Sequence, residues 1–319
     1  MSPADPAPGT IVVALGGNAV APPMERPTIA SQFRHTRESL APVVELARRG
    51  WRIAIVHGNG PQVGDELLRN EIARGGVEPL PLGVLVAATA GWMGYMIQQS
   101  LQNALRRAKV ERGVVTVVTQ TLCDEGDPGL QHPAKPIGHV LDEEARRRLE
   151  ERGVPVERDG AGRWRRMVPS PRPVAIVERD VVRTLVREGQ LVVTCGGGGP
   201  PVYNDANLLT EGVDAVVDKD RVAAILGREL GAEVLLILTD VDAVYRGWGT
   251  PAAEALRRLT LTEAETLIAD GEAAAGSMRP KIEAASEFVR GGGRSAVIAE
   301  LKQGLDALAG LAGTTVVPG

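Results

Sequence analysis

The chain has 319 residues, enough to bury a substantial core, and its 44% hydrophobic and 24% charged content is typical of a soluble globular protein. Its net charge of −4 argues against nucleic acid as the main partner, because phosphate contacts need a basic face. The most apolar stretch, residues 84–97, is too short to cross a membrane and is interrupted by two glycines. The N-terminus does not resemble a secretory signal, so we expect a cytoplasmic protein whose two cysteines, Cys123 and Cys195, are buried and reduced.

Short apolar runs alternate with helical patterns along most of the chain. Such runs, bounded by glycine, proline or charged residues, are typical of buried strands. The predicted strands cover residues 10–15, 52–57, 113–119, 190–199 (including four terminal glycines), 234–240, 295–300 and 314–317. The predicted helices cover residues 31–49, 60–75, 84–108, 219–230, 262–269 and 280–290. This alternation predicts an α/β fold with a largely parallel sheet.

Residues 123–168 interrupt the alternation. This stretch is rich in Pro, Gly, Asp and Arg, and it contains a charged helical pattern followed by a predicted hairpin that turns at residues 160–162. We interpret it as an insertion that projects from the sheet. The arginine-rich stretch 163–166 is then explained as a solvated face of the hairpin.

Three of the predicted strands end in glycine clusters, which are Gly16-Gly17-Asn18, Gly58-Asn59-Gly60 and Gly196 to Gly199. Ligands of open parallel sheets bind beyond the carboxyl ends of the strands, where glycines let backbone amides approach an anion. Turn geometry explains one such cluster equally well, but three at equivalent strand ends favour a shared phosphate or carboxylate site. The sequence contains neither a P-loop nor the dinucleotide fingerprint, so this phosphate site is of another kind.

Lysine is rare in this chain, since only five of the 36 basic residues are lysines. An ammonium group is compact and movable, so these few lysines are candidates for ligand contacts. Lys219 lies between Asp218 and Asp220 at a predicted helix start, Lys281 opens another helix, and Lys135 lies on the projecting segment. Several lysines around one locus suit phosphoryl transfer, and a flanking aspartate could orient an ammonium or help to hold Mg²⁺. The alternative for each lysine alone is a solvated surface charge. We keep this interpretation for Lys109 and Lys302.

His57 directly precedes the second glycine cluster. A general base is conceivable there, but we favour a histidine that structures the end of the strand. Trp92, Met93 and Met96 recur at helical spacing and are more simply explained as core or as a subunit contact than as a cofactor site.

Nine motifs follow one another along the chain. They are ALGGNA (14–19), HGNGPQVG (57–64), KPIG (135–138), RRMVPSPRPVAIVE (165–178), CGGGGPPV (195–202), GVDAVVDKD (212–220), LLILTDVDAVY (235–245), GTPAAEALRRLTLTEAE (249–265) and AGSMRPKIEAA (275–285). Together they resemble the carbamate kinases of the amino acid kinase superfamily, over roughly residues 11 to 317. HGNGPQVG and VPSPRP are specific to carbamate kinases, whereas the glycine clusters and the aspartate-flanked lysine are shared more widely.

The resemblance implies a single amino acid kinase domain (1–319), a three-layer αβα sandwich with a mainly parallel sheet and a small protruding subdomain. It implies an N-terminal lobe (1–206) that binds carbamate and includes a lid (123–168), a C-terminal lobe (207–319) that binds nucleotide, and assembly as a homodimer. The implied reaction is the reversible, Mg²⁺-dependent transfer of the ATP γ-phosphoryl group to carbamate, which gives carbamoyl phosphate and ADP. The family also suggests a use in ATP synthesis during arginine catabolism.

The resemblance also implies a role for individual residues. Lys219 and Lys281 would neutralise the nucleotide phosphates, Asp220 would align these two lysines, and Lys135 would close over the substrate. The glycine-cluster residues expected to hold the transferring phosphoryl group and carbamate are Gly16, Gly17, Asn18, Gly58, Asn59, Gly60, Gly197 and Gly198. The residues expected near the nucleoside are Asp240, Val244, Tyr245 and Met278. Mg²⁺ would be held mainly by the nucleotide phosphates.

Two features depart from the family pattern. Arg279 stands where most members have Gly or Ala, and an added guanidinium there could strengthen phosphate binding or obstruct it. KPIG is followed by residues 139–141 (HVL) instead of a PFY-like sequence, which bears on how the lid packs. Two other functions therefore stay open: a kinase of the same superfamily with another carboxylate or phosphate acceptor, and a nucleotide-binding sensor without catalysis.

Overall fold

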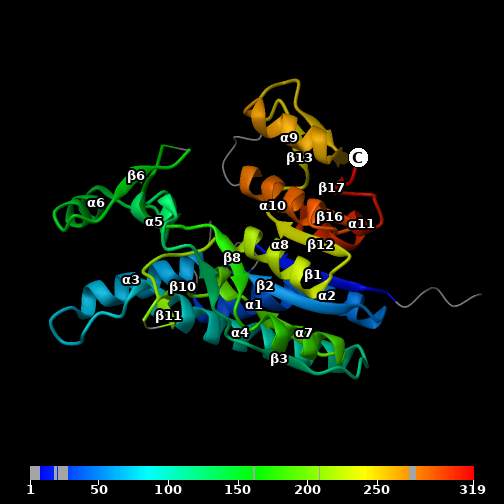
Figure 1. Cartoon of the computed structure of the whole chain (residues 1–319), viewed down its shortest axis with the longest axis horizontal. Coiled ribbons are helices and arrows are strands. Elements are labelled where there is room, and N and C mark those ends of the chain that lie inside the picture. The colour runs from blue at the N-terminus through cyan, green and yellow to red at the C-terminus, as the bar shows by residue number, and fades with distance from the viewer. Residues whose placement is uncertain (1–7, 18–19, 21–27, 161, 208, 273–277) are drawn as a thin grey trace, which may run out of the picture.

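The computed structural model describes residues 8–17, 20, 28–160, 162–207, 209–272 and 278–319 (Figure 1). Its centre is an eight-stranded sheet with the order β15-β17-β16-β12-β1-β2-β9-β3. In that order the strands are Arg258–Thr260, Thr314–Val317, Ser295–Glu300, Val234–Thr239, Thr10–Leu15, Arg52–His57, Leu191–Thr194 and Val114–Thr116. Each neighbouring pair is parallel except β16 and β17. The prediction of a largely parallel sheet is confirmed.

Helices cover both faces of this sheet (Figure 1). Buried side chains place α7, α8, α9 and α10 on one face and α2, α4 and α11 on the other. The helices are α1 Ile29–Ser39, α2 Ala41–Arg48, α3 Gly60–Ala73, α4 Leu82–Arg107, α7 Arg179–Arg187, α8 Lys219–Leu230, α9 Leu261–Ala269, α10 Met278–Arg290 and α11 Gly304–Leu308. The three-layer αβα sandwich is therefore confirmed. Within the described residues, no helix is both long and apolar enough to span a bilayer.

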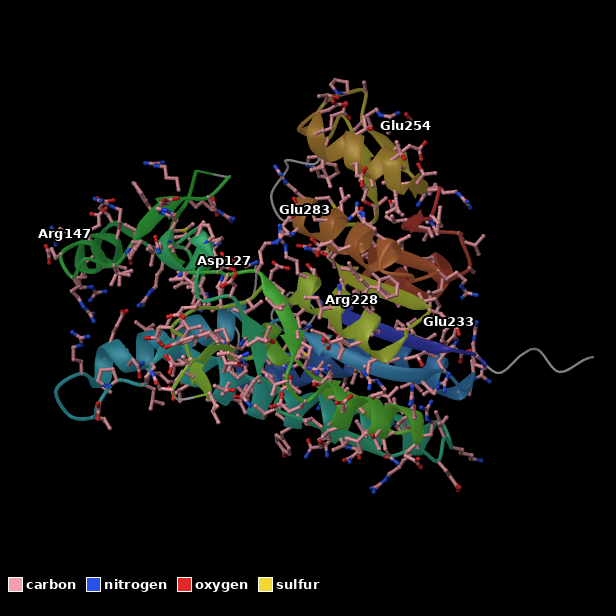
Figure 2. All side chains as sticks on the ribbon, viewed as in Figure 1. Asp127, Arg147, Arg228, Glu233, Glu254 and Glu283 are labelled. Atoms are coloured by element: carbon pink, nitrogen blue, oxygen red, sulfur yellow. The ribbon has the colours of Figure 1, made fainter. Side chains whose placement is uncertain are left out.

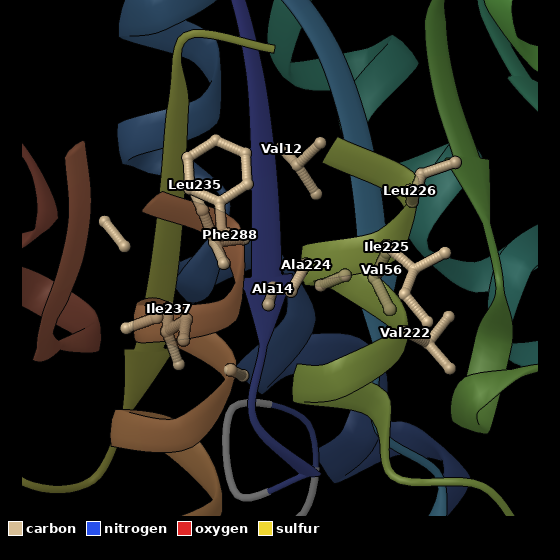
Figure 3. Close-up of a cluster of buried hydrophobic side chains, with 14 of the residues drawn as sticks. Val12, Ala14, Val56, Val222, Ala224, Ile225, Leu226, Leu235, Ile237 and Phe288 are labelled. Atoms are coloured by element: carbon tan, nitrogen blue, oxygen red, sulfur yellow. The ribbon is translucent and has the colours of Figure 1, made fainter. Parts of the chain in front are cut away.

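Strand β1 explains why the apolar runs of the sequence are continuous. Successive side chains of a strand point to opposite faces, and here both faces are covered by helices. Val12 and Ala14 pack with α8 and with Phe288 of α10 (Figure 3), whereas Ile11 and Val13 pack into the second core on the other face. The whole strand is buried.

The prediction of one helix over residues 31–49 was wrong, because the structure has two helices that break at Leu40. Pro42 lies in the first turn of α2, where its missing N–H is tolerated, whereas inside a continuous helix it would remove a hydrogen bond. The strand predicted at 113–119 is also shorter than expected, since β3 ends at Thr116.

A second, four-stranded sheet has the order β11-β10-β4-β8, and β13 pairs with β14 in a separate hairpin. These strands are β4 Thr121–Cys123, β8 Pro173–Ile176, β10 Pro201–Asp205, β11 Leu209–Gly212, β13 Val244–Arg246 and β14 Glu254–Leu256. Most of them, together with α7, had no counterpart among the predicted elements. They are short, and two of them begin with proline, which weakens the strand signal in a sequence.

Residues 128–168 form most of a small subdomain that stands away from the main sheet, at the left of Figure 1. Its three-stranded antiparallel sheet has the order β5-β7-β6. Its elements are α5 Pro128–Gln131, β5 Lys135–Ile137, α6 Glu143–Glu150, β6 Val156–Arg158 and β7 Trp164–Val168. The predicted hairpin is confirmed, because Arg158 pairs with Trp164 across a turn that includes Gly160 and Gly162.

Candidate functional site

The first two glycine clusters lie side by side because β1 and β2 are neighbours in the sheet. The Gly16 N–H donates to the Leu238 carbonyl at 2.8 Å, and the Gly58 N–H donates to the Leu15 carbonyl at 3.0 Å. Helix α3 begins two residues later at Gly60, so its N-terminus points at the same edge of the sheet. Asn18, the last residue of the first cluster, lies outside the described residues.

The third glycine cluster contacts the second through a turn of 3-10 helix, Gly196–Gly198. Gly197 has a φ of 68°, and a Cβ on it would lie only 2.1 Å from Nδ2 of Asn59. A Cβ on Gly198 would lie 2.5 Å from the carbonyl oxygen of Val217, which leads into α8. Glycine is thus the residue that permits this approach, and the third cluster joins the second to the start of α8.

Lys219 is the first residue of α8, and its side chain reaches the other strand ends. A Cβ on Gly58 would lie 3.1 Å from Cδ and 3.2 Å from Cε of Lys219, and also 3.1 Å from the backbone nitrogen of Gly17. The lysine stem therefore crosses directly over Gly58. Three segments from distant parts of the chain meet at this point.

Asp220 bridges two lysines. One carboxylate oxygen contacts Nζ of Lys219, and the other lies 3.5 Å from Nζ of Lys281 on the first turn of α10. Asp220 is 3% exposed and Lys281 is 6% exposed, so this pair is screened little by solvent. Burial lowers the pKa of Lys281, and the charge of Lys219 lowers it further, while the charges of Asp220 and Asp218 raise it.

Asp218 joins the start of α8 to the protruding subdomain. Its Oδ1 caps the helix by accepting from the backbone N–H of Asp220 at 3.0 Å and of Arg221 at 3.3 Å. Its Oδ2 contacts Nζ of Lys135, on β5. Burial would raise the pKa of Asp218, but the charge and hydrogen bond of Lys135 and the charge of Lys219 hold it well below its usual range. Asp218 is therefore ionised, and it contacts Lys135 of the protruding subdomain as well as the start of the helix.

The structure thus brings Lys135, Lys219 and Lys281 into one cluster with two carboxylates. All three lysines lie near the start of α8, beside the glycine-lined strand ends. Ammonium groups arranged in this way bind phosphate oxygens and neutralise the charge of phosphoryl transfer. The amides of Gly16 and Gly58 already donate to backbone carbonyls, so they are not free to bind an anion. Sequence reasoning had named the lysines and Asp220 as site residues, but it had given no role to Asp218 as the partner of the lid lysine.

His57 does not have the properties of a general base. Its side chain is 1% exposed, Nδ1 lies 3.2 Å from its neighbour's carbonyl, and burial lowers its pKa to about 4. A Cβ on Gly196 would lie 2.6 Å from Nε2 of this ring, so the imidazole packs directly beneath the third glycine cluster. The favoured interpretation, a histidine that structures the strand end, agrees with this geometry. The neighbouring Asn59 is also buried and donates from Nδ2 to Thr89 at 2.8 Å.

The residues expected near the nucleoside have different environments. Asp240, after β12, is exposed, and Tyr245 is partly exposed and donates from its hydroxyl to Asp242 at 2.9 Å. Val244 is 1% exposed and belongs to the hydrophobic core, so its side chain does not face solvent. Met278, the first residue of α10, is half-buried against the same core.

Arg279 belongs to an ion-pair cluster that links α8 to α10. Its Nε donates to one oxygen of Glu283 at 2.9 Å, and Arg221 donates to the other oxygen at 2.6 Å. Burial would raise the pKa of Glu283, but its hydrogen bonds to the two arginines hold it below its usual value. Glu283 is labelled at the start of α10 in Figure 2. The guanidinium of Arg279 thus has an acidic partner in this chain.

No group of three or more His, Cys, Asp or Glu side chains is placed to hold a metal ion in the ranges that the structure describes. The two aspartates beside Lys219 are already engaged by ammonium groups. Within the described ranges, no such cluster offers a ready-made metal site.

Comparisons with known proteins agree with this fold. The amino acid kinase family model matches residues 9–300. Carbamate kinase from Pyrococcus horikoshii is 41% identical over 98% of this chain and 100% of the relative, and that from Halobacterium salinarum is 47% identical over 96% and 98%. Structures of Giardia lamblia carbamate kinase bound to citric acid and to AMP-PNP have TM-scores of 0.93 and 0.89, with 36% identity over 98% of this chain and 99% of theirs.

This chain belongs to the amino acid kinase family, and it is therefore a phosphotransferase. Within that family it falls, over nearly its whole length, among the carbamate kinases.

Proposed function

We propose that this protein catalyses the reversible transfer of the γ-phosphoryl group of ATP to carbamate, giving carbamoyl phosphate and ADP. The observation that carries the proposal is the bridge that buried Asp220 makes between Lys219 and Lys281, beside the glycine-lined ends of β1 and β2. Carbamate is a small planar anion with few contact points, so backbone amides and ammonium groups must provide most of its binding.

The roles of the cluster residues follow from their places. Asp220 fixes the spacing of the two ammonium groups, which would bind the nucleotide phosphates and neutralise the charge that develops on the transferring group. The stem of Lys219 lies over Gly58, so this lysine would act close to the backbone amides of the strand ends. Direct in-line transfer then needs alignment and charge neutralisation, without a phosphorylated side chain.

The two lobes would divide the substrates. We assign carbamate to residues 1–206 and the nucleotide to residues 207–319, with Lys135 of the lid (123–168) closing over the substrates. The lid is docked on α3 by contacts that support this role: His139 lies 2.8 Å from Asp65, and the Gly138 N–H donates to the Gly60 carbonyl at 3.4 Å. His139 is the first of the unusual residues after KPIG, so this chain attaches its lid through a polar contact.

Mg²⁺ would enter with the nucleotide. Because the described carboxylates do not form a metal site of their own, we propose that the nucleotide phosphates hold the ion as part of the substrate. A cytoplasmic location, assembly as a homodimer and a use in arginine catabolism remain expectations from the family.

One assay tests the proposal directly. Purified protein is incubated with carbamoyl phosphate, ADP and Mg²⁺, and ATP formation is followed through a coupled reaction. We expect turnover of order 1 to 10³ s⁻¹, the range of typical enzymes. Absence of ATP formation together with ADP formation on acetylglutamate, aspartate or isopentenyl phosphate would instead identify another acceptor. Nucleotide binding by calorimetry without any turnover would identify a sensor.

A further inference from the structure

A second cationic pocket lies at the far end of the central strands. It has a volume of about 190 Å³ and is lined in part by Thr10 at the start of β1 and Arg52 at the start of β2. The glycine clusters follow the opposite ends of these two strands. A six-residue strand is about 20 Å long, so this pocket is well separated from the lysine cluster.

Three arginines line this pocket. Arg52 comes from the sheet, whereas Arg183 and Arg187 come from consecutive turns of α7. The described side chains that line the pocket include no carboxylate. Like charges around one cavity repel each other, so this arrangement attracts an anion.

The three arginines differ in how far their charges are already used. Arg183 is engaged, because it donates to Asp180 at 2.5 Å and to the carbonyl of Glu229, near the end of α8, at 2.9 and 3.1 Å. The side chains of Arg52 and Arg187 form no hydrogen bond or ion pair with any residue that the structure describes. Arg52 and Arg187 are exposed, so their two guanidinium groups are available beside that of Arg183, which is already hydrogen-bonded.

Among the described residues, Asp180 is the acidic side chain that pairs with a pocket arginine, Arg183. Glu233 follows the end of α8, but its carboxylate is directed toward Gly9 and pairs at 4.0 Å with Arg294. Arg228, labelled in Figure 2, lies in the last turn of α8, the end opposite to Lys219. The hydroxyl-bearing Thr10 is 6% exposed and offers a further polar contact at the pocket wall.

We propose that this pocket is a binding site for a compact oxyanion of the size of inorganic phosphate, held by Arg52 and Arg187 and oriented by Arg183. The planar guanidinium fork matches two oxygens of such an anion, which an ammonium does not. The occupant would join the starts of β1 and β2 to α7 and the end of α8, and it would stabilise the fold from the side opposite the lysine cluster. The proposal does not depend on which acceptor the kinase uses.

The test compares two double variants that remove the same charge. R52Q/R187Q neutralises the pocket, and R106Q/R107Q neutralises two exposed arginines in the last turn of α4. Each protein is titrated with inorganic phosphate up to about 20 mM, with sodium chloride holding the ionic strength constant. Thermal unfolding and calorimetry are the readouts, since a ligand of the native state raises the unfolding midpoint.

Phosphate at the lysine cluster affects all three proteins equally, so the difference between the variants isolates the pocket. We expect wild type and R106Q/R107Q to share the same phosphate-dependent rise and R52Q/R187Q to lose at least tenfold in affinity for one of the bound phosphates. An identical phosphate response in the two double variants overturns the proposal. ATP formation in R52Q/R187Q, measured alongside, verifies that the variant is folded.

Discussion

Lys135 of the protruding subdomain contacts Asp218, the residue that caps helix α8, although 83 residues separate them in the chain. One carboxylate oxygen holds the backbone of the helix start, and the other holds the lid lysine. The position of the lid and the position of Lys219 are thus fixed by one side chain. Because different oxygens make these contacts, a substitution at Asp218 can remove the contact with Lys135 and still cap the helix.

The variant Asp218→Asn separates the contact with Lys135 from the capping of α8. Asparagine caps helices about as well as aspartate, so the start of α8 should persist, while the charge partner of Lys135 is removed. We expect turnover to fall at least tenfold, because Lys135 loses its charge partner. We also expect a lower unfolding midpoint, because a carboxylate whose pKa is held below its usual range stabilises the folded state when it is ionised. Steady-state kinetics and thermal unfolding check this together. Unchanged turnover would show that Lys135 does not depend on the charge of Asp218 for its position.

Removing the ammonium group of Lys219 or of Lys281 should lower turnover strongly. We expect Lys219→Ala and Lys281→Ala each to lower turnover by about a hundredfold or more, the usual effect of losing one charge contact to a transition state. Lys302→Ala, at an exposed position near the C-terminal end of β16, is the matched control and should keep wild-type turnover. Near-normal ATP formation by either of the first two variants would contradict the proposed roles.

The buried bridge also predicts a pH dependence. Burial lowers the pKa of Lys281, and an active enzyme needs this ammonium charged, so turnover should decline at a pH below the ordinary lysine value of 10.5. Over the same window the unfolded chain binds more protons than the folded chain, so this group's contribution to the free energy of unfolding rises with pH. Activity and stability should therefore move in opposite directions there.

The variant Asp220→Asn tests whether the pKa of Lys281 sets the pH dependence of turnover. The charge of Asp220 raises the pKa of Lys281, so its removal should move the alkaline decline of turnover to lower pH. Breaking a buried pair also leaves an uncompensated charge, which costs about 3–5 kcal/mol of stability. Asp270→Asn, at the exposed end of α9, is the control. An unchanged pH profile in Asp220→Asn would refute the coupling of these two groups.

Sequence patterns predicted those parts of the fold that have local signals. Helix α8 matched its predicted span because Asp218 caps its start and Gly231, in the left-handed region, ends it. Strands β1 and β2 matched because both of their faces are buried, which requires continuous apolar runs. The short strands of the second sheet lack such a signal, because their pairing depends on segments far apart in the chain.

The candidate site was predictable as a set of residues but not as a network. The rarity of lysine, together with their positions at helix starts and on the projecting segment, singled out Lys135, Lys219 and Lys281, and the structure brings them together. The pairing of Asp218 with the lid, and that of Arg279 with Glu283, depend on which oxygen faces which neighbour. Such contacts follow from the packing of α8, α10 and β5, and no spacing in the sequence encodes them.

The crossing of Lys219 over Gly58 predicts the effect of a single methyl group. In Gly58→Ala the new Cβ would lie 3.1 Å from Cδ of Lys219 and 3.1 Å from the backbone nitrogen of Gly17, so the lysine must move by a few tenths of an ångström. We expect turnover to fall about tenfold or more, since small displacements of a catalytic group reduce rates strongly. Gly212→Ala, where a Cβ meets nothing within 4 Å, should have wild-type kinetics.

Arg279, the departure from the family pattern, should affect activity little. Because Glu283 already engages its guanidinium and the side chain is 56% exposed, we expect Arg279→Ala to change turnover and the nucleotide KM by less than about threefold. Glu283 keeps Arg221 as a partner in this variant, so the link between α8 and α10 persists. The measurement is ATP formation at varied ADP concentration. A gain of more than tenfold in turnover would mean that Arg279 obstructs the site, and a comparable rise in KM would mean that it binds the phosphates.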